Sequence, residues 1–303
     1  MPRQSRCNSQ VVVLGAGPGL AEVLRILRED HIRPTAIVSI AYDTEEKGFT
    51  GERIASTAVD DLRSSLEALA SEDGALLRAI RRPLAIGNVG RQRLGNLVIG
   101  SIAHGFGDYA QASIWLGERL GIAGAVLPAT VGPVQRRIDT GQDIPPRGRA
   151  GRLRFVGGSL RSPRAAVTAI EHAEWVLLAP GSLYRSVIAT AAVPDVARAL
   201  RTTPAPVLWI ASPEPDFSEA GGPIGIEELQ LLRSHGIRVD AVLYDSQAAH
   251  GFDRGELLSR GVEAIPRPLR GSQDLARGDP ERLRRALAGV IRSSSSGPTG
   301  RSS

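Results

Sequence analysis

The sequence predicts an α/β protein with a three-layer, Rossmann-like, doubly wound and mostly parallel sheet, and a small β-hairpin excursion. Two observations support this fold class. Short apolar runs alternate with amphipathic stretches of helical period along most of the 303 residues. Glycine-rich turns also follow two of the apolar runs directly, at residues 15–19 and 179–184. Such turns are typical of the strand-to-helix connections in parallel sheets.

The first predicted unit is a strand, a turn and a helix. Four apolar residues, 11–14, form the strand, and the turn reads Gly-Ala-Gly-Pro-Gly at 15–19. Apolar residues then recur at positions i, i+3, i+4 and i+7, which places them on one helix face. These residues are Leu20, Val23, Leu24 and Leu27.

The next predicted elements continue the alternation. A second strand at 35–40 is followed by a polar loop at 42–51. We expect a helix to begin at Asp61, because Leu62, Leu66 and Leu69 form an apolar face after it. Residues 96–121 are predicted to be helical with an interruption near 105–107, and a short strand at 125–127 ends at Pro128.

The second half of the chain resumes the same order after a different segment. Residues 131–165 are rich in Gly, Pro and Arg, which predicts a hairpin-like excursion. Buried strands are then expected at 175–178, 207–210 and 241–244, with a helix at 226–232. The last helix has a predicted N-cap at Asp279 and Pro280 at its first position. We therefore expect one α/β domain over 10–292, between disordered tails at 1–9 and 293–303.

Composition excludes several classes of protein. No apolar run reaches about 18 residues, so a membrane span is not expected. The first ten residues lack the apolar core of a secretory signal, and we expect a cytoplasmic protein. The single cysteine, Cys7, excludes an internal disulfide framework. The net charge of +5 comes from scattered arginines, and aromatic residues make up only 4%, so the pattern favours an arginine-biased surface over a nucleic-acid interface.

The first turn is a candidate anion-binding loop. Gly15, Gly17 and Gly19 would let backbone N–H groups approach an anion at the helix N-terminus. The spacing is G-x-G-x-G, so it matches neither the G-x-G-x-x-G of dinucleotide sites nor a P-loop. Asp43 is the acid candidate for a NAD site, but it comes late after the second strand. A plain strand-to-helix connection without a ligand is the alternative.

The second turn, at 179–184, repeats the arrangement. Gly181 and Ser182 follow a predicted buried strand and open the next helix. Ser182 would either cap that helix or face a phosphate. Since doubly wound sheets bind ligands at the carboxyl ends of their strands, we expect both turns to face one cleft.

Carboxylates supply the candidate catalytic and metal-binding groups. Asp43 and Asp61 could hold Mg²⁺ against a diphosphate if they converge, and either could act in catalysis. The pair Asp60 and Asp61 could instead cap a helix. Asn96 opens an apolar helical stretch and is either an N-cap or a ligand contact. The five histidines lack metal-site spacing.

Taken in order, the motifs resemble those of the CofD/YvcK superfamily over roughly residues 10–292. The segments that carry the resemblance are the first turn, Asp-Leu-Arg (61–63), Leu-Gly-Asn-Leu (94–97), Val-Leu-Pro-Ala-Thr (126–130) and Pro-Gly-Ser-Leu-Tyr-x-Ser (180–186). The last two look most like the YvcK/GlmR branch, called gluconeogenesis factors, which is related to the phospholactate transferase CofD. The resemblance implies the α/β fold and a nucleotide diphosphate or related phosphoester as ligand, in some members with Mg²⁺.

The departures from the branch pattern lie in ligand-facing loops. The first turn usually reads Gly-Gly-Gly-Thr-Gly, and paired aspartates usually precede glycines where this chain has Tyr42-Asp43-Thr44-Glu45. A late Asn-Asn looks replaced by Asp245-Ser246. We therefore identify a divergent member whose fold is kept and whose ligand can differ.

Two functional hypotheses follow from the resemblance. The chain could be a regulatory protein that binds a nucleotide-sugar such as a UDP-sugar. It could instead be a CofD-like transferase that moves a phosphoryl-linked group from a nucleoside diphosphate donor to an acceptor alcohol. Both take a nucleotide diphosphate ligand rather than NAD, and a homo-oligomer is an open alternative for the assembly.

Overall fold

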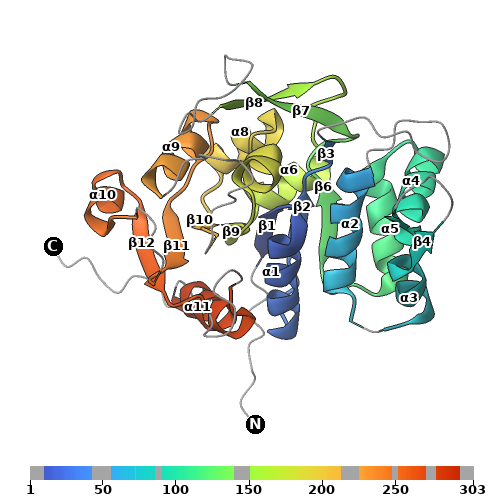
Figure 1. Cartoon of the computed structure of the whole chain (residues 1–303), viewed down its shortest axis with the longest axis horizontal. Coiled ribbons are helices and arrows are strands. Elements are labelled where there is room, and N and C mark those ends of the chain that lie inside the picture. The colour runs from blue at the N-terminus through green and yellow to red at the C-terminus, as the bar shows by residue number, and fades with distance from the viewer. Residues whose placement is uncertain are drawn as a thin grey trace, which may run out of the picture.

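The computed structural model of the chain describes residues 10–42, 56–71, 73–85, 91–139, 151–212, 225–247, 252–270 and 278–293 (Figure 1). Asp43 and most of both predicted tails lie outside these residues, so the predictions made for them stay predictions. Within the described ranges, no helix combines the length and the apolar character needed to cross a bilayer.

A seven-stranded sheet with the order β12-β11-β10-β9-β1-β2-β6 forms the centre of the molecule. Every neighbouring pair in it is parallel. The predicted α/β fold class is confirmed. The strands are β1 (Val11–Gly15), β2 (Thr35–Val38), β6 (Ala125–Pro128), β9 (Trp175–Leu178), β10 (Val207–Ile210), β11 (Ala241–Asp245) and β12 (Glu263–Arg267).

Helices cover both faces of this sheet, which explains the continuous apolar runs. In β1, Val11 and Val13 belong to one core cluster, while Val12 and Leu14 belong to the other. The first cluster includes residues of α1 (Gly17–Glu29), α2 (Ser56–Leu69), α3 (Ala75–Arg81), α4 (Leu94–Phe106), α5 (Tyr109–Leu120) and α11 (Pro280–Ser293). The second includes residues of α6 (Arg164–Glu171), η2 (Leu183–Ile188), α7 (Ala189–Ala191), α8 (Pro194–Thr202), α9 (Ile226–Ser234) and α10 (Arg254–Ser259).

The predicted excursion is a hairpin of β7 (Val134–Asp139) and β8 (Arg152–Val156), which pair antiparallel. Its first strand also pairs with β3 (Ala41–Tyr42), which follows the carboxyl end of β2. The hairpin therefore lies beyond the carboxyl edge of the main sheet, along the top of Figure 1. A further short pair consists of β4 (Pro83–Ala85) and β5 (Arg91–Arg93).

Two predictions about helix boundaries have opposite outcomes. The predicted interruption near 105–107 is confirmed, because α4 ends before Gly107, which adopts a φ of 67°. The predicted helix start at Asp61 is wrong, since α2 begins at Ser56. Asp60 and Asp61 therefore lie inside a helix, and the reading of this pair as caps is incorrect. The elements α3, β4, β5, α10 and β12 were not among the predicted ones.

Candidate functional site

The two glycine-rich turns lie side by side. Strand β1 pairs directly with β9, in a register that places Leu14 opposite Leu178. The residues that follow these strands, 15–19 and 179–182, therefore meet at the carboxyl edge of the sheet. The chain adds β2 on one side of β1 and β9 on the other, so this is the point where the strand order reverses. Ligands of doubly wound sheets bind at such a point.

Two of the three glycines in the first turn are required by packing between the turns. A Cβ atom on Gly19 would lie 2.0 Å from the carbonyl oxygen of Pro180. A Cβ atom on Gly15 would lie 3.0 Å from the Cβ of Ala179, and its φ is +156°. These glycines let α1 begin directly against the second turn, whatever ligand the site takes.

Gly17 is different, because the space beside it is open. Its φ is +75°, and an ideal Cβ at this position would have no described atom within 4 Å apart from its chain neighbours and the backbone of its own helix. Pro18 follows in the first turn of α1, whose N-cap residue, Ala16, supplies no side-chain cap. Since the first N–H groups of a helix have no partner within the helix, the open side of Gly17 is where an anion could approach α1.

The segment after the second turn fastens the first turn in place. It is a π-helix, η2, and such segments are frequent at functional sites. The hydroxyl Oγ of Ser186 accepts a hydrogen bond from the N–H of Ala16 at 2.8 Å and donates to the carbonyl of Ala16 at 3.0 Å. Thr190, in the short helix α7 that follows η2, donates from its Oγ1 to the carbonyl oxygen of Gly15 at 3.2 Å. Ser186 was part of the sequence motif, but neither residue was predicted to hold the turn.

Ser182 acts as the N-cap of η2, one of its two predicted roles. Its Oγ accepts a hydrogen bond from the N–H of Arg185 at 3.3 Å. Gly181 precedes it with a φ of +149°, and its ideal Cβ would lie 3.7 Å from the carbonyl oxygen of Ala16. Gly181 therefore borders the first turn, while a shared cleft and contact with a phosphate stay predictions.

Asp61 is the carboxylate that the fold places at the first turn. Its Oδ1 accepts a hydrogen bond from the N–H of Gly17 at 2.9 Å. Loss of hydration raises the pKa of Asp61 from 3.8 to about 6 and outweighs the Gly17 hydrogen bond, which lowers it. The negative charge of Asp60 raises this pKa further, while Arg136 and Arg63 lower it. Asp61 can therefore exchange a proton close to neutral pH.

Arg136 supplies positive charge from the hairpin and was not among the predicted site residues. It is only 8% exposed, and its Nη1 donates to the carbonyl oxygens of Ala41 at 3.3 Å and Arg185 at 3.1 Å. Alternation along β7 puts Arg136 on the same side as buried Val134. An arginine at a core-facing strand position was the signal that could have revealed it.

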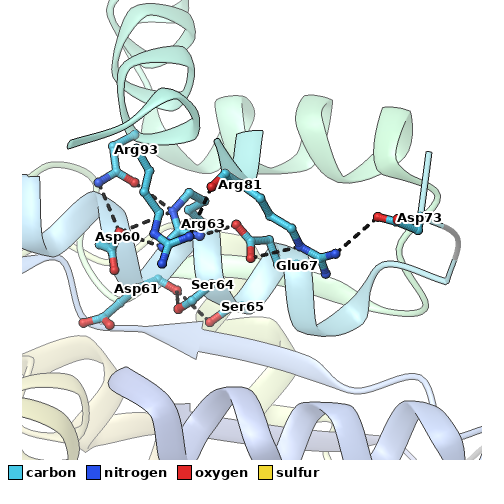
Figure 2. A network of polar contacts seen from close by, with 10 residues as sticks. Asp60, Asp61, Arg63, Ser64, Ser65, Glu67, Asp73, Arg81 and Arg93 are labelled. Carbon is cyan, nitrogen blue, oxygen red and sulfur yellow. Dashed lines mark hydrogen bonds and ion pairs between the residues drawn. The ribbon is translucent and has the colours of Figure 1, made fainter. Parts of the chain in front are cut away.

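Asn96 joins a polar network between α2 and α4 instead of capping α4. Figure 2 shows Asp60, Arg63, Glu67, Arg81 and Asp73 linked in sequence. The Arg63 Nε donates to Asn96 Oδ1 at 3.0 Å, and Asn96 Nδ2 donates to Asp60 Oδ1 at 3.2 Å. The N-cap position belongs to Arg93. The capping reading of Asn96 is therefore wrong, and its role as a ligand contact stays a prediction.

The predicted metal site is only half visible. Asp43 lies outside the described residues, so its convergence with Asp61 stays a prediction. Within the described ranges, no group of three or more His, Cys, Asp or Glu side chains is placed to hold a metal ion. Of the predicted pair, the described residues thus provide one carboxylate, and its Oδ1 already accepts the Gly17 hydrogen bond.

The fold and the site define a Rossmann-like α/β protein with paired glycine-rich turns at the reversal of strand order. The family described as 2-phospho-L-lactate transferase CofD matches residues 11–251. The chain belongs to this family, which confirms the resemblance inferred from the motifs.

Curated relatives carry the name of the gluconeogenesis-factor branch. The "Putative gluconeogenesis factor" of Deinococcus radiodurans is 29% identical over 92% of this chain and 65% of its own length. A protein of the same name from Nostoc sp. is 31% identical over 67% of this chain and 47% of its own length. The chain thus spans about half to two thirds of these two relatives. The "Gluconeogenesis factor" of Halalkalibacterium halodurans is 28% identical over 74% of this chain and 73% of its own length.

A solved structure shows the same fold. A member of the UPF0052 family from Bacillus halodurans superposes with a TM-score of 0.76, over 92% of this chain and 98% of that one. The two chains are 23% identical, so this likeness concerns the fold.

Proposed function

We propose that this protein binds a nucleotide diphosphate, in the form of a nucleotide-sugar such as a UDP-sugar, and acts as a regulatory binding protein of the gluconeogenesis-factor type. The observation that carries the proposal is the pair of glycine-rich turns at the reversal of strand order, with the open side of Gly17 at the N-terminus of α1. The names of the curated relatives are consistent with it.

Each group around the turn would have a distinct task. The N-terminus of α1 would attract the diphosphate through its dipole and the N–H of Gly19, because Ser186 and Asp61 already accept from the N–H groups of Ala16 and Gly17 and Pro18 has none. Ser186 would hold the Ala16 peptide in the required orientation before the ligand arrives. Arg136 would offset negative charge at the site. Its guanidinium is already in place before a ligand binds, because it donates to two backbone carbonyls.

A transferase remains the second candidate, and the pKa of Asp61 favours it. A carboxyl group with a pKa of about 6 is suited to general base catalysis near neutral pH. In the reaction, the acceptor hydroxyl oxygen would bond to the phosphorus of the donor while the bond to the departing nucleotide breaks. Asp61 would take the hydroxyl proton. The match to the CofD family also supports this reading.

Calorimetric titration of a single glycine variant tests the binding proposal. Asparagine tolerates positive φ better than other non-glycine residues, so Gly17→Asn fills the open space with little strain on the turn. We expect its affinity for the best UDP-sugar or GDP, with or without Mg²⁺, to fall at least tenfold. The matched control is Gly107→Asn, at a φ of +67° and with open space beside it, at the end of α4.

Equal binding by the Gly17→Asn and Gly107→Asn variants would show that the turn is only a connector. Release of product from donor and acceptor pairs, absent in Asp61→Asn, would favour the transferase. A ligand that binds only the folded protein stabilises it by about 2.7 kcal/mol at one hundred times its Kd, so thermal shift can rank the panel first.

A further inference from the structure

A surface cavity of about 510 Å³, open to solvent, lies at the far edge of the sheet from β6. It is lined by Gln247, Arg267, Pro268, Arg282, Arg285 and Ala286. Gln247 and Arg267 lie at the carboxyl ends of β11 and β12, and the other two arginines belong to α11. The volume falls within the range of small-molecule sites.

Arginine provides all the charge on the lining residues. Arg282 and Arg285 lie one turn apart on α11, and no lining residue among those described is acidic. Their acidic neighbours, Asp279 at 3.6 Å and Glu281 at 3.1 Å, belong to the N-terminal end of the helix and not to the lining. Arg267 donates to the carbonyl of Pro266 at 2.8 Å and makes no ion pair in the described part of the chain. The lining therefore suits an anion.

A buried aspartate holds the walls of this cavity. Asp245 is 2% exposed, and its carboxylate accepts hydrogen bonds from the N–H of Leu269 at 2.9 Å and from Arg270 Nε at 2.5 Å. Arg270 Nη2 also donates to the carbonyl of Gln247 at 2.7 Å. Burial alone would raise the pKa of Asp245, but the hydrogen bonds from Leu269 and Arg270 lower it below its ordinary value. Asp245 and Arg270 thus fix the backbone on the side of the cavity formed by Gln247 and the segment after β12.

The cavity is separate from the candidate site. Strand β12 is four positions from β1 in the sheet, which corresponds to roughly 19 Å at the usual strand spacing. One phosphate group cannot contact both places.

Guanidinium groups bind phosphate oxygens in pairs of hydrogen bonds and are weakly hydrated, so arginine suits this ligand better than lysine would.

We propose that this cavity is a second binding site, for a phosphorylated small molecule whose phosphate is held by Arg267, Arg282 and Arg285. Asp245 and Arg270 position the backbone that carries two of its walls. The site does not depend on the function proposed for the first turn, because it uses different strands and different residues.

Titration with pyrophosphate, combined with hydrogen exchange, tests the proposal. In the parent chain and in Gly17→Asn, we expect pyrophosphate to slow amide exchange in segments that contain residues 267–270 and 280–286. The double variant Arg267→Gln/Arg285→Gln should bind at this site at least tenfold more weakly. The control Arg198→Gln removes an exposed arginine that pairs with Asp195 on α8, and we expect no change.

The proposal is overturned if the double variant binds pyrophosphate as tightly as Arg198→Gln, or if exchange slows only around residues 15–20 and 180–186. The two proposals can also fail separately. If pyrophosphate still protects residues 267–270 while Gly17→Asn binds UDP-sugars as the parent does, this second site is supported and the first one is refuted. Circular dichroism of the double variant checks that it is folded; both side chains lie at the surface, so we expect a native spectrum.

Discussion

The buried carboxyl group of Asp61 makes the stability of the protein depend on pH. Its pKa of about 6 in the folded protein exceeds the ordinary value of 3.8. The folded state therefore binds more protons than the unfolded state between these two values. By linkage, the free energy of unfolding falls as the pH rises through this window. A difference of about two pH units between the folded and unfolded pKa of Asp61 corresponds to about 3 kcal/mol of the free energy of unfolding.

We predict that Asp61→Asn stabilises the protein above pH 6. The amide removes the buried charge and can still accept the Gly17 hydrogen bond. The melting temperature should exceed that of the parent by several degrees at pH 8, and the difference should vanish below about pH 4. Thermal unfolding at pH 4, 6 and 8 measures it.

The neighbouring residue provides the control for this prediction. Asp60 pairs with Arg63 at 2.6 Å, and Arg63 is 3% exposed. Asp60→Asn should therefore lower the melting temperature at pH 8. The measured quantity is the difference in melting temperature between Asp61→Asn and the parent. If this difference is no larger at pH 8 than at pH 4, burial of the Asp61 charge does not destabilise the folded protein.

At the scale of elements, the short segments around the carboxyl edge decide the geometry of the site. The π-helix η2 connects β9 to the next helices and places Ser186 against the first turn, and the short helix α7 that follows places Thr190 there. The hairpin of β7 and β8 brings Arg136 to the same place. His235 at the end of α9 holds the hairpin, because its Nε2 accepts a hydrogen bond from the N–H of Leu153 at 2.9 Å.

We predict that Ser186→Ala lowers the free energy of unfolding by about 1–3 kcal/mol, because the buried N–H and carbonyl of Ala16 lose their side-chain partner. Ligand affinity should fall with it. The control is Ser113→Ala, whose hydroxyl donates to Val126 at 2.7 Å in another part of the core. It should cost similar stability in urea titrations without changing affinity. Equal affinity in both variants would limit Ser186 to a structural role.

The hairpin contact should depend on pH. Burial lowers the pKa of His235 below 6.5; the Leu231 carbonyl raises it and Arg152 lowers it. Protonation would replace the acceptor of the Leu153 N–H with a second donor. The stabilisation is thus complete above pH 6.5 and is lost as the pH falls toward the folded-state pKa.

We predict that His235→Asn unfolds at a lower temperature than the parent at pH 7.5, and that this difference shrinks toward pH 5. Scanning calorimetry across this range measures the difference, and comparison within one pH removes the contribution of Asp61. A difference that is constant with pH would exclude His235 as the titrating group.

Across the molecule as a whole, the last helix, α11, packs in the same hydrophobic core as the first helix, α1. Leu287 of α11 is 1% exposed in the same cluster as Leu24 of α1. Arg284 of α11 also pairs with Asp30, the residue that follows α1, at 2.5 Å. Figure 1 shows α11 beside α1 on one face of the sheet.

We predict that Leu287→Ala costs about 2–5 kcal/mol of stability in urea titrations, because it leaves a cavity in this core. Arg284→Gln should cost much less, since exposed ion pairs contribute little. If Leu287→Ala proves as mild as Arg284→Gln, then α11 packs loosely and its apolar face does not complete the core.

The sequence alone determined the fold class, because continuous apolar runs and helical periodicity reflect burial that acts locally. It also located the first turn, Gly181 and Ser182, since strand-to-helix turns with glycine are local patterns. The features that the sequence did not reveal are contacts between residues far apart along the chain. The network that holds Asn96 and the place of Arg136 both depend on partners in other elements.

The tertiary structure shows which glycines of the first turn are required by packing. Gly19 must be glycine because Pro180, distant in sequence, lies against it, whereas Gly17 faces open space. It likewise decided that Asp61 meets the Gly17 N–H and that Asp245 holds the walls of an arginine-lined cavity. Those properties arise from burial and from charges on separate strands and helices, and the sheet brings these together only once the chain has folded.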